Sequence, residues 1–307
     1  MFRIAHVSDL HVLASTGVEL RRMIFNKRIT GFANVAFKRA RVYRRDFLIR
    51  VLETASTSAD HLVVTGDITN LSLESEYEEA VALLREAARS TLVTVIPGNH
   101  DIYLPVTLRE RRFPFHFEPF LGSDLPEFAL DLPAGRFPSV RLTGPAAVIG
   151  LSSAVPRPPF VSAGIVGEPQ LEALSRLLQH PEVVRRTPVI LVHHSPFDLR
   201  VRWEQLRGGL VDAAALREAL QPLARGLVLY GHHHERRLQP LPTRSGALQA
   251  ACASAAALDH ASPRVRAGFN LYGLDEAGTV RTLEARVLAP DGRGFETHAL
   301  TPSGSPT

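Results

Sequence analysis

Residues 92–101 read Leu-Val-Thr-Val-Ile-Pro-Gly-Asn-His-Asp, an apolar run followed by a glycine turn and three polar side chains. The run Leu92–Ile96 has the composition of a buried strand, and the glycine permits a tight turn directly after it. Asn99, His100 and Asp101 therefore stand where a strand ends. Because ligands in α/β sheets bind beyond the carboxyl ends of the strands, this stretch predicts the fold class and the position of a site.

The same arrangement recurs four times along the chain. Polar groups follow apolar, strand-like segments at Ser8-Asp9-Leu10-His11, Gly66-Asp67, His193-His194-Ser195-Pro196 and Gly231-His232-His233-His234. Loops that follow parallel strands gather at one edge of a sheet, so these groups can converge although they are far apart in sequence. We expect them to form one site.

The residue types in these loops predict metal ions. Asp, Asn and His supply oxygen and nitrogen ligands without a thiolate, which suits Mn, Fe, Co, Ni or Zn better than Ca or Mg. The candidates are too many for one tetrahedral ion and enough for two if one carboxylate bridges them. Two ions about 3.5–4 Å apart can activate a water and hold both oxygens of an in-line displacement at phosphorus.

The remaining periodicity predicts an α/β fold. Strand-like runs at Arg3–Val7, His61–Thr65, Ala146–Leu151, Val189–Val192 and Gly226–Tyr230 alternate with helix-like stretches such as Val42–Ser56, Glu74–Ser90, Glu168–Leu178 and Ala213–Leu220. Alternation of this kind is typical of βαβ units. Three late runs, Ala247–Ala253, Phe269–Leu274 and Val280–Leu288, predict an antiparallel sheet that finishes the fold.

No stretch reads as a linker between domains. We therefore expect a single domain over residues 1–300 and a disordered tail over residues 301–307. The Pro-rich stretch Leu104–Gly144 lacks periodicity and is expected to form surface loops or an insert.

The order of the motifs, D-x-H, G-D, G-N-H-D, H and G-H-x-H, resembles the calcineurin-like metallophosphoesterases. The motifs run from Asp9 to His234 in a chain of 307 residues. The resemblance implies an α/β protein with a two-sheet β-sandwich flanked by helices, a four-layer arrangement. The N-terminal D-x-H, the H-H-S-P run and the length are most similar to the bacterial class III phosphodiesterases that act on cyclic nucleotides.

The resemblance also implies a role for each matching position. Two transition-metal ions, Mn, Fe or Zn, would be held by one set comprising Asp9, His11 and His234 and by a second comprising Asn99, His193 and His232, with Asp67 as the bridge between them. His100 would hydrogen-bond the phosphate and assist the leaving group, and Asp101 would orient His100. A metal-bound hydroxide would attack phosphorus and hydrolyse a phosphodiester or phosphomonoester.

One ligand is ambiguous because His193 and His194 are adjacent. Side chains at neighbouring positions of a strand point in opposite directions, so only one of the two is expected to face the site. The family pattern favours His193.

The segment Arg21–Arg50 holds ten Lys or Arg residues and one opposing acid, Asp46, in a chain whose net charge is +4. Such a segment is either a solvated helix face or a surface that attracts an anionic membrane or a phospholipid-like substrate. It favours one alternative activity, hydrolysis of a nucleotide-linked lipid at its pyrophosphate. Its aromatic residues have the spacing of a helix core, so nucleic acid and a nuclease activity are less favoured.

A further alternative, from a different class, is a non-catalytic metal-binding scaffold, although every ligand position is filled. Cys252 is the only cysteine, so no disulfide within the chain is possible, and it is expected to be a small buried residue. No stretch is long and apolar enough to span a bilayer, and a cleaved leader would remove the first motif. We therefore expect a cytoplasmic enzyme that can also meet the inner face of the membrane.

Overall fold

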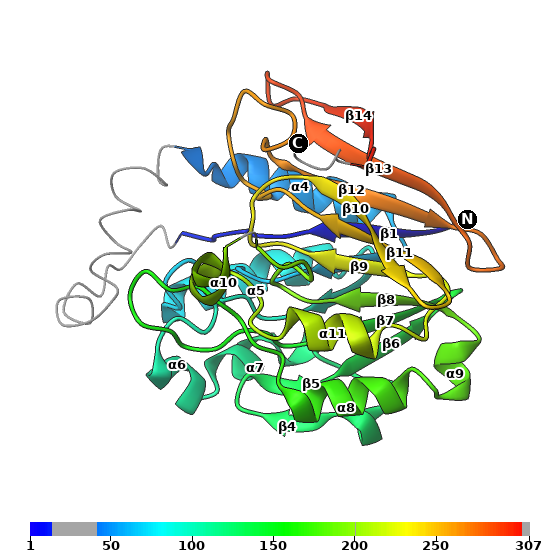
Figure 1. The fold of residues 1–307 in the computed structure, drawn as a ribbon. Coiled ribbons are helices and arrows are strands. Elements are labelled where there is room, and N and C mark those ends of the chain that lie inside the picture. Colours follow the sequence, from blue (N-terminus) through cyan, green and yellow to red (C-terminus); the bar gives the residue numbers. More distant parts are fainter. Residues whose placement is uncertain (14–41, 200, 303–307) are drawn as a thin grey trace.

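Two six-stranded β-sheets organise the part of the chain that the computed structural model describes, residues 1–13, 42–199 and 201–302 (Figure 1). The first sheet contains, in spatial order, β14 (Phe295–Ala299), β13 (Val280–Leu288), β12 (Gly268–Leu274), β1 (Phe2–Val7), β2 (His61–Val64) and β3 (Leu92–Val95). The second contains β10 (Arg237–Thr243), β11 (Gly246–Cys252), β9 (Leu227–Tyr230), β8 (Thr187–Leu191), β7 (Ala146–Gly150) and β6 (Ser139–Thr143).

The strands that precede the polar loops are parallel to their neighbours in this group. β1 and β2 lie inside the first sheet and β3 forms one of its edges, whereas β8 and β9 lie inside the second sheet. In the first sheet β1, β2 and β3 are parallel, and in the second β7, β8, β9 and β11 are parallel. Antiparallel strands complete each sheet: β12, β13 and β14 on one side of the first sheet, and β6 and β10 at the two edges of the second. Strands covered on both faces need apolar side chains at every position, which explains the continuous apolar runs in the sequence.

The two sheets pack face to face around a shared apolar layer. Ile4 and Val63 from the first sheet lie in one buried cluster with Val148, Val189 and Leu191 from the second. Because both inner faces are apolar, this interior holds the sheets together through burial of apolar surface.

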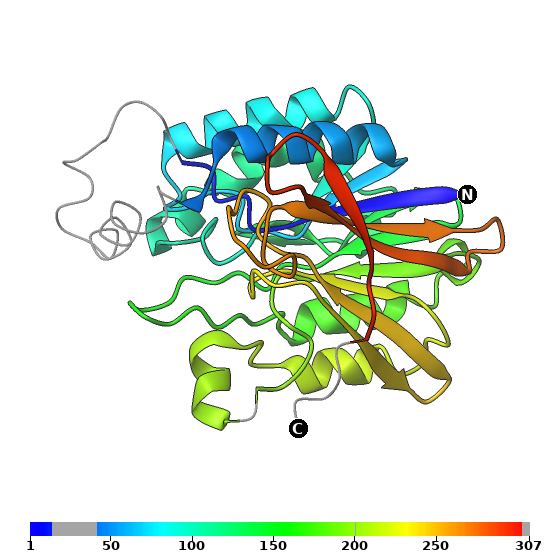
Figure 2. The same ribbon diagram turned by 90° about the horizontal axis from the view of Figure 1, so that it is seen from above.

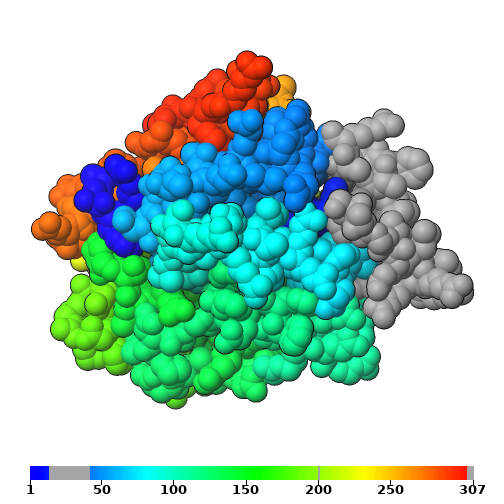
Figure 3. All heavy atoms as spheres, turned by 180° about the vertical axis from the view of Figure 1, so that it is seen from behind, coloured from blue at the N-terminus to red at the C-terminus, as the bar shows by residue number. Residues whose placement is uncertain are grey.

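Helices cover the outer face of each sheet. On the first sheet lie α4 (Arg45–Ser58) and α5 (Glu74–Ala87), whose surface fills the middle of the view in Figure 3. The buried residues of α4, Phe47, Leu48, Val51, Leu52 and Ala55, recur at helical spacing and form the stripe that packs on the sheet. On the second sheet lie α8 (Glu168–Leu177) and α11 (Ala213–Ala219). The predicted four-layer sandwich of two sheets flanked by helices is confirmed (Figure 2).

One prediction about the fold is wrong, and a second is incomplete. The late run predicted at Ala247–Ala253 does not join the other late strands in one antiparallel sheet, because β11 pairs in parallel with β9 in the second sheet. The stretch Leu104–Gly144 is not simply irregular. It contains α6 (Pro105–Arg109), α7 (Arg112–Phe117), two single-turn 3₁₀ helices (Glu118–Phe120 and Pro126–Phe128) and the strands β4 (Leu130–Leu132), β5 (Gly135–Phe137) and β6. The buried rings of Phe113, Phe117 and Phe120 anchor it to the core and outweigh the Pro-rich local sequence.

The short helices α9 (Pro181–Val184) and α10 (Arg202–Gly208) complete the described structure. None of the helices in the described ranges combines the length and the apolar character needed to cross a membrane. The predicted tail, residues 301–307, lies outside the described residues from Ser303 onward, as does most of the basic segment Arg21–Arg50, up to Arg41.

Candidate metal centre

The five polar loops converge as predicted, each at the carboxyl end of its strand. The loop after β1 is joined to the loop after β2 by two backbone hydrogen bonds, from Asp9 N–H to the Gly66 carbonyl and from His11 N–H to the Asp67 carbonyl, both 3.0 Å. The loops after β8 and β9 are joined by a bond of 3.0 Å from Gly231 N–H to the His193 carbonyl. The site is thus held by backbone contacts between parallel neighbours.

Five of the candidate ligands have backbone conformations that non-glycine residues seldom adopt. Their φ angles are positive: 52° at Asp9, 45° at His11, 51° at Asp67, 70° at His232 and 55° at His234. Each such residue costs roughly 1–3 kcal/mol, and such residues persist where the surrounding structure holds them in place, typically at functional sites. These backbone conformations direct five side chains from three loops into the same candidate metal site.

Glycines next to the ligands permit close approach of the loops. A Cβ atom at Gly98 would lie 2.2 Å from both the backbone nitrogen and Oδ1 of Asp67, and one at Gly231 would lie 1.9 Å from Ser8 Oγ. Any larger residue at either position would displace the loop that carries Asp67 or Asp9.

The first group of ligand atoms comes from the loops after β1 and β9. His234 Nε2 lies 3.1 Å from Asp9 Oδ1 and 3.1 Å from His11 Nε2. Two ligand atoms that bind one ion at about 2.1 Å, at right angles, are about 3.0 Å apart. Asp9 Oδ1 is buried and accepts no hydrogen bond from the described residues. The spacing and the unsatisfied oxygen both fit a metal ion.

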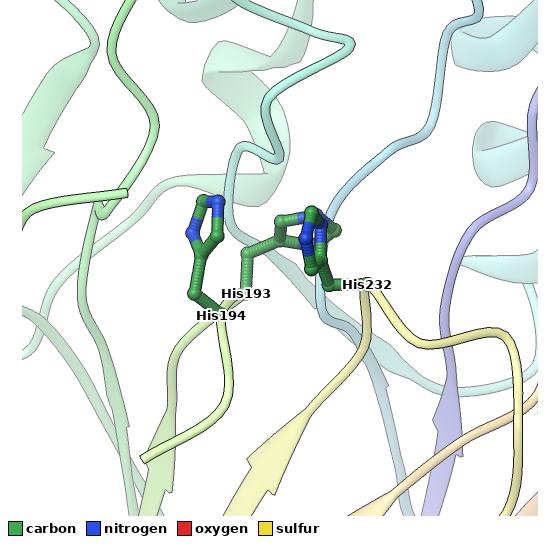
Figure 4. Close-up of side chains that lie close together, drawn as sticks. All are labelled: His193, His194 and His232. Carbon is green, nitrogen blue, oxygen red and sulfur yellow. The ribbon is translucent and has the colours of Figure 1, made fainter. Parts of the chain in front are cut away.

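The second group comes from the loops after β3, β8 and β9. Asn99 Oδ1 lies 3.2 Å from His193 Nε2 and 3.0 Å from His232 Nδ1. Figure 4 shows the rings of His193 and His232 turned toward each other. These distances again match neighbouring ligands on one ion.

Asp67 lies between the two groups. Its Oδ1 is 3.4 Å from His193 Nε2 in the second group, and its carboxylate belongs to a cluster with Asp9, His11 and His234, whose ligand atoms all lie within 4.8 Å of one another. A carboxylate with two oxygens in this position can contact both ions.

Hydrogen bonds outside the site fix the orientation of the candidate ligand rings. His193 Nδ1–H donates to the Thr65 carbonyl at 2.7 Å, and His232 Nε2–H donates to the Gly208 carbonyl at 2.9 Å. Since a carbonyl can only accept, the nitrogen bonded to it carries a proton, and the other nitrogen of each ring faces the site. His234 Nδ1 contacts the Tyr43 hydroxyl at 3.0 Å. Metal-binding histidines are normally held in this way.

His194 lies near the site with both ring nitrogens occupied. Its Nε2–H donates to the Ser162 carbonyl at 2.8 Å, and Nδ1 contacts the Ser153 hydroxyl at 2.7 Å. Its ring centroid is only 4.7 Å from that of His232, so the expectation that it points away is wrong. Position alone therefore does not separate His193 from His194, but the hydrogen bonds favour His193 as the ligand.

His100 projects over the first group from the loop after β3. Its ring centroid is 4.9 Å from that of His11, its backbone N–H donates to Asp67 Oδ1 at 2.8 Å, and its Nδ1–H donates to the Asn70 carbonyl at 2.6 Å. The expectation that Asp101 orients this ring is wrong.

The Asp101 carboxylate instead binds the backbone of the loops after β2 and β3. It accepts hydrogen bonds from the backbone N–H groups of Gly98 at 2.8 Å, Ile68 at 3.2 Å and Thr69 at 2.7 Å, and from the Thr69 hydroxyl at 2.9 Å. Asp101 therefore positions the loop that carries Asp67, and Asn70 takes over the orientation of His100.

The charges of the site attract cations. Burial alone would raise the pKa of Asp67, yet His193 and His100 hold it well below its ordinary value. Burial alone would lower the pKa of His193, but the Asp67 and Asp9 carboxylates raise it to about 9. Two buried carboxylates that draw a proton onto a buried imidazole will draw a metal cation more strongly. The donor set, its spacing and its charge therefore fit two metal ions.

Comparison with known proteins agrees with the fold and identifies the family. The model of the calcineurin-like phosphoesterases matches residues 2–236. The chain belongs to this family and is a metal-dependent phosphoester hydrolase. Comparison with curated proteins by sequence gives no match.

Solved structures of similar fold include phosphatases. One is a dimetal phosphatase from Danio rerio, with 15% identity, a TM-score of 0.56 and coverage of 98% of this chain and 99% of that one. Another is purple acid phosphatase PPD1 from yellow lupin (Lupinus luteus) seeds, with 12% identity, a TM-score of 0.58 and coverage of 99% of this chain and 54% of that one. At these identities the likeness shows a shared fold.

Two residues of the site have no signal in the sequence analysis. Tyr43 contacts His234 from just before α4, and Asn70 contacts His100 through its main chain. A lone tyrosine and a backbone carbonyl form no motif, so only the fold reveals them. Cys252 is fully buried, as predicted.

Proposed function

We propose that this protein hydrolyses phosphodiesters with two metal ions, one held by Asp9, His11 and His234 and the other by Asn99, His193 and His232. Asp67 is the bridge. The observation that carries the proposal is the spacing of 3.0–3.2 Å between neighbouring donor atoms in each group, with Asp67 in reach of both. When bound, the ions supply an activated water and stabilise charge on the phosphoryl oxygens.

The protein's own groups orient the substrate and handle the proton of the leaving group. His100 lies beside the first group, and its Nδ1–H is held by the Asn70 carbonyl, so Nε2 is the nitrogen that acts on the substrate. From there it can hydrogen-bond a phosphoryl oxygen and protonate the departing oxygen. Asp101 and its bonds to the neighbouring loops keep this geometry fixed.

The substrate we propose is a small phosphodiester, with a cyclic nucleotide as the first candidate. The support is the D-x-H motif of Asp9 and His11 and the H-H-S-P run at residues 193–196, which resemble bacterial cyclic-nucleotide phosphodiesterases. The alternatives are a nucleotide-linked lipid cleaved at its pyrophosphate and, less favoured, a nucleic acid. A scaffold without activity would not need the His100 arrangement.

The metals we propose are Mn, Fe or Zn, because nitrogen and oxygen donors without sulfur suit them. A cytoplasmic location is proposed from the sequence. Contact of the basic segment Arg21–Arg50 with an anionic membrane is also a proposal, and its described members give it little support. Arg44 pairs with Asp46 at 2.7 Å, and Arg45 pairs with Glu79 at 2.6 Å, so these charges are partly neutralised.

A substrate panel with added Mn²⁺ tests the proposal. The panel contains an aryl phosphodiester, an aryl phosphomonoester, cyclic nucleotides and a nucleotide-diphospho lipid. We expect turnover of the diesters that disappears with chelator and returns with metal. The Asp67→Asn variant, purified alongside, is the matched control for a contaminating hydrolase. Metal-dependent turnover that persists in the Asp67→Asn variant would contradict the proposal. So would a parent protein that turns over none of the substrates in the panel.

A further inference from the structure

An apolar wall stands beside the metal centre and has no role in the chemistry above. It consists of the exposed side chains Phe160, Val201, Trp203 and Leu206. These are 77%, 43%, 54% and 53% exposed, respectively, although large apolar side chains are normally buried. Phe160 belongs to the loop between β7 and α8, and the other three belong to α10 or lie just before it. Grouped exposed apolar residues of this size mark an interaction site.

The two segments of the wall are joined to each other. Ser162 N–H donates to the Arg207 carbonyl at 2.7 Å, and Gly164 N–H donates to the Gly209 carbonyl at 3.0 Å. The Arg207 guanidinium lies 4.8 Å from the centroid of the Trp203 ring and also contacts the Phe160 carbonyl at 3.5 Å. The loop and α10 therefore form one surface.

The wall is also attached to the metal centre. The Ser162 carbonyl holds His194, and the Gly208 carbonyl holds His232, at 2.8 and 2.9 Å. Figures 1 and 2 show both segments projecting at the end of the sandwich where β1 finishes. A molecule seated on the wall is therefore next to the site at which phosphate esters are hydrolysed.

The backbone around Phe160 holds its apolar side chain in solvent. Phe160 has a φ angle of +66°, a conformation that is costly for a bulky residue, and follows the rigid run Pro156-Arg157-Pro158-Pro159. A strained backbone that presents a phenylalanine to solvent, and not to the core, indicates that the exposed ring is used.

The charges around the wall are mainly positive. Arg157, Arg202 and Arg207 flank it, with Glu204 as the opposing acid on α10. Within the described residues neither Arg202 nor Arg207 pairs with a carboxylate. Tryptophan and phenylalanine with arginines beside them are the composition of a surface that lies at the boundary between acyl chains and anionic headgroups.

We propose that this wall docks the enzyme on an anionic lipid surface. Phe160, Trp203 and Leu206 enter the acyl boundary and the arginines meet the phosphate headgroups. A stacking platform for a nucleobase is a poorer fit, because Arg207 already covers one face of Trp203 and Val201 and Leu206 offer no aromatic face. Where the proposed phosphodiesterase function also holds, the docked enzyme meets phosphate esters carried by lipids.

Trp203 is the only tryptophan of the chain, so its fluorescence reports on the wall directly. Full-length protein is mixed with vesicles of phosphatidylcholine, with and without anionic phosphatidylglycerol. We expect a blue shift of the emission with the anionic vesicles, and quenching by brominated acyl chains. Salt should weaken the binding, because the arginine contribution is screened.

Variants locate the contact. Leu206→Ser and Phe160→Ser should each lower vesicle affinity by about tenfold, since burial of one such side chain is worth about that factor. Val184→Ser is the matched control, because Val184 is 65% exposed on α9 at the opposite end of the sandwich in Figure 1. It should bind vesicles like the parent.

Three results would overturn the proposal. The first is an unshifted Trp203 emission with anionic vesicles. The second is equal vesicle affinity of the Leu206→Ser variant and the parent. The third is an emission shift that a soluble nucleotide or self-association causes in place of lipid. Activity on an aryl phosphodiester is measured in the same samples and should not change in Phe160→Ser or Leu206→Ser. A parent that binds vesicles but hydrolyses no ester would contradict the proposed function and leave the docking surface standing.

Discussion

Replacement of Tyr43 by phenylalanine should weaken one of the two metal sites selectively. The change removes the hydroxyl group that lies 3.0 Å from His234 Nδ1 and keeps the ring, which packs edge-on against His11 at 5.2 Å between centroids. For His234 to bind a metal through Nε2, its Nδ1 must carry the proton and donate a hydrogen bond to the Tyr43 hydroxyl oxygen. Without that acceptor the ring loses its preferred tautomer and orientation.

The expected loss is about 10- to 100-fold in affinity, the usual effect of removing a partner of a metal ligand. That corresponds to about 1.4–2.7 kcal/mol. It should fall on the ion held by Asp9, His11 and His234. The other group should be unaffected, because its rings are held by the Thr65 and Gly208 carbonyls.

Calorimetric titration of metal-free protein with Mn²⁺ measures both affinities. The matched control is Ser153→Ala, which removes a hydroxyl at 2.7 Å from His194, a histidine beside the site that we do not assign as a ligand. It should leave both affinities unchanged. Equal affinities in Tyr43→Phe and the parent would refute the reasoning. So would an equal loss in Ser153→Ala, because the effect would then be a general loosening of the site.

The remaining predictions concern His100, the adjacent pair His193 and His194, and the buried His61. His100→Ala should lower kcat by roughly 10²–10⁴-fold, less with good leaving groups, while metal analysis finds the parent's content; a loss of metal would show that His100 is a ligand. His193→Ala should lose metal and His194→Ala should keep it, and the reverse result would move the ligand by one residue. Burial lowers the pKa of His61 from 6.5 to about 3, so the unfolded chain takes up the proton first as the pH falls. The contribution of buried His61 to the free energy of unfolding is complete above pH 6.5. It falls below that pH by up to about 1.4 kcal/mol per pH unit. Urea unfolding between pH 7 and pH 5 should show a shallower loss in His61→Gln, and identical slopes would contradict the assignment.

The sequence was sufficient to predict the strands that carry the site. An apolar run that is buried on both faces and followed by a polar turn is a local signal, and β1, β2, β3, β8 and β9 all show it. Convergence of the loops then follows from the geometry of parallel strands. For this reason the sequence alone predicts that Asp9 and His234 belong to one site, and their ligand atoms lie 3.1 Å apart.

Pairing between strands was harder to predict, because it depends on contacts distant in sequence. Alternation shows that Gly246–Cys252 is a strand but not which sheet it joins, and β10 and β14 were missed because prolines and charges interrupt their patterns. The hydrogen-bond partners of the site residues could not be predicted for a related reason, because they too depend on contacts distant in sequence. The family resemblance implies that Asp101 orients His100, yet the Asp101 carboxylate accepts a hydrogen bond from the backbone of Thr69.

The most direct test of the central claim is the metal content of the purified enzyme measured together with its activity. Reconstituted parent protein should bind about two transition-metal ions per chain and hydrolyse a phosphodiester only when both are present. Asp67→Asn should weaken the binding of both ions, since the Asp67 carboxylate of the parent reaches both groups. Activity should be lost together with the ions. A parent that is fully active with one ion per chain, or an Asp67→Asn variant that keeps two ions and full activity, would contradict the account.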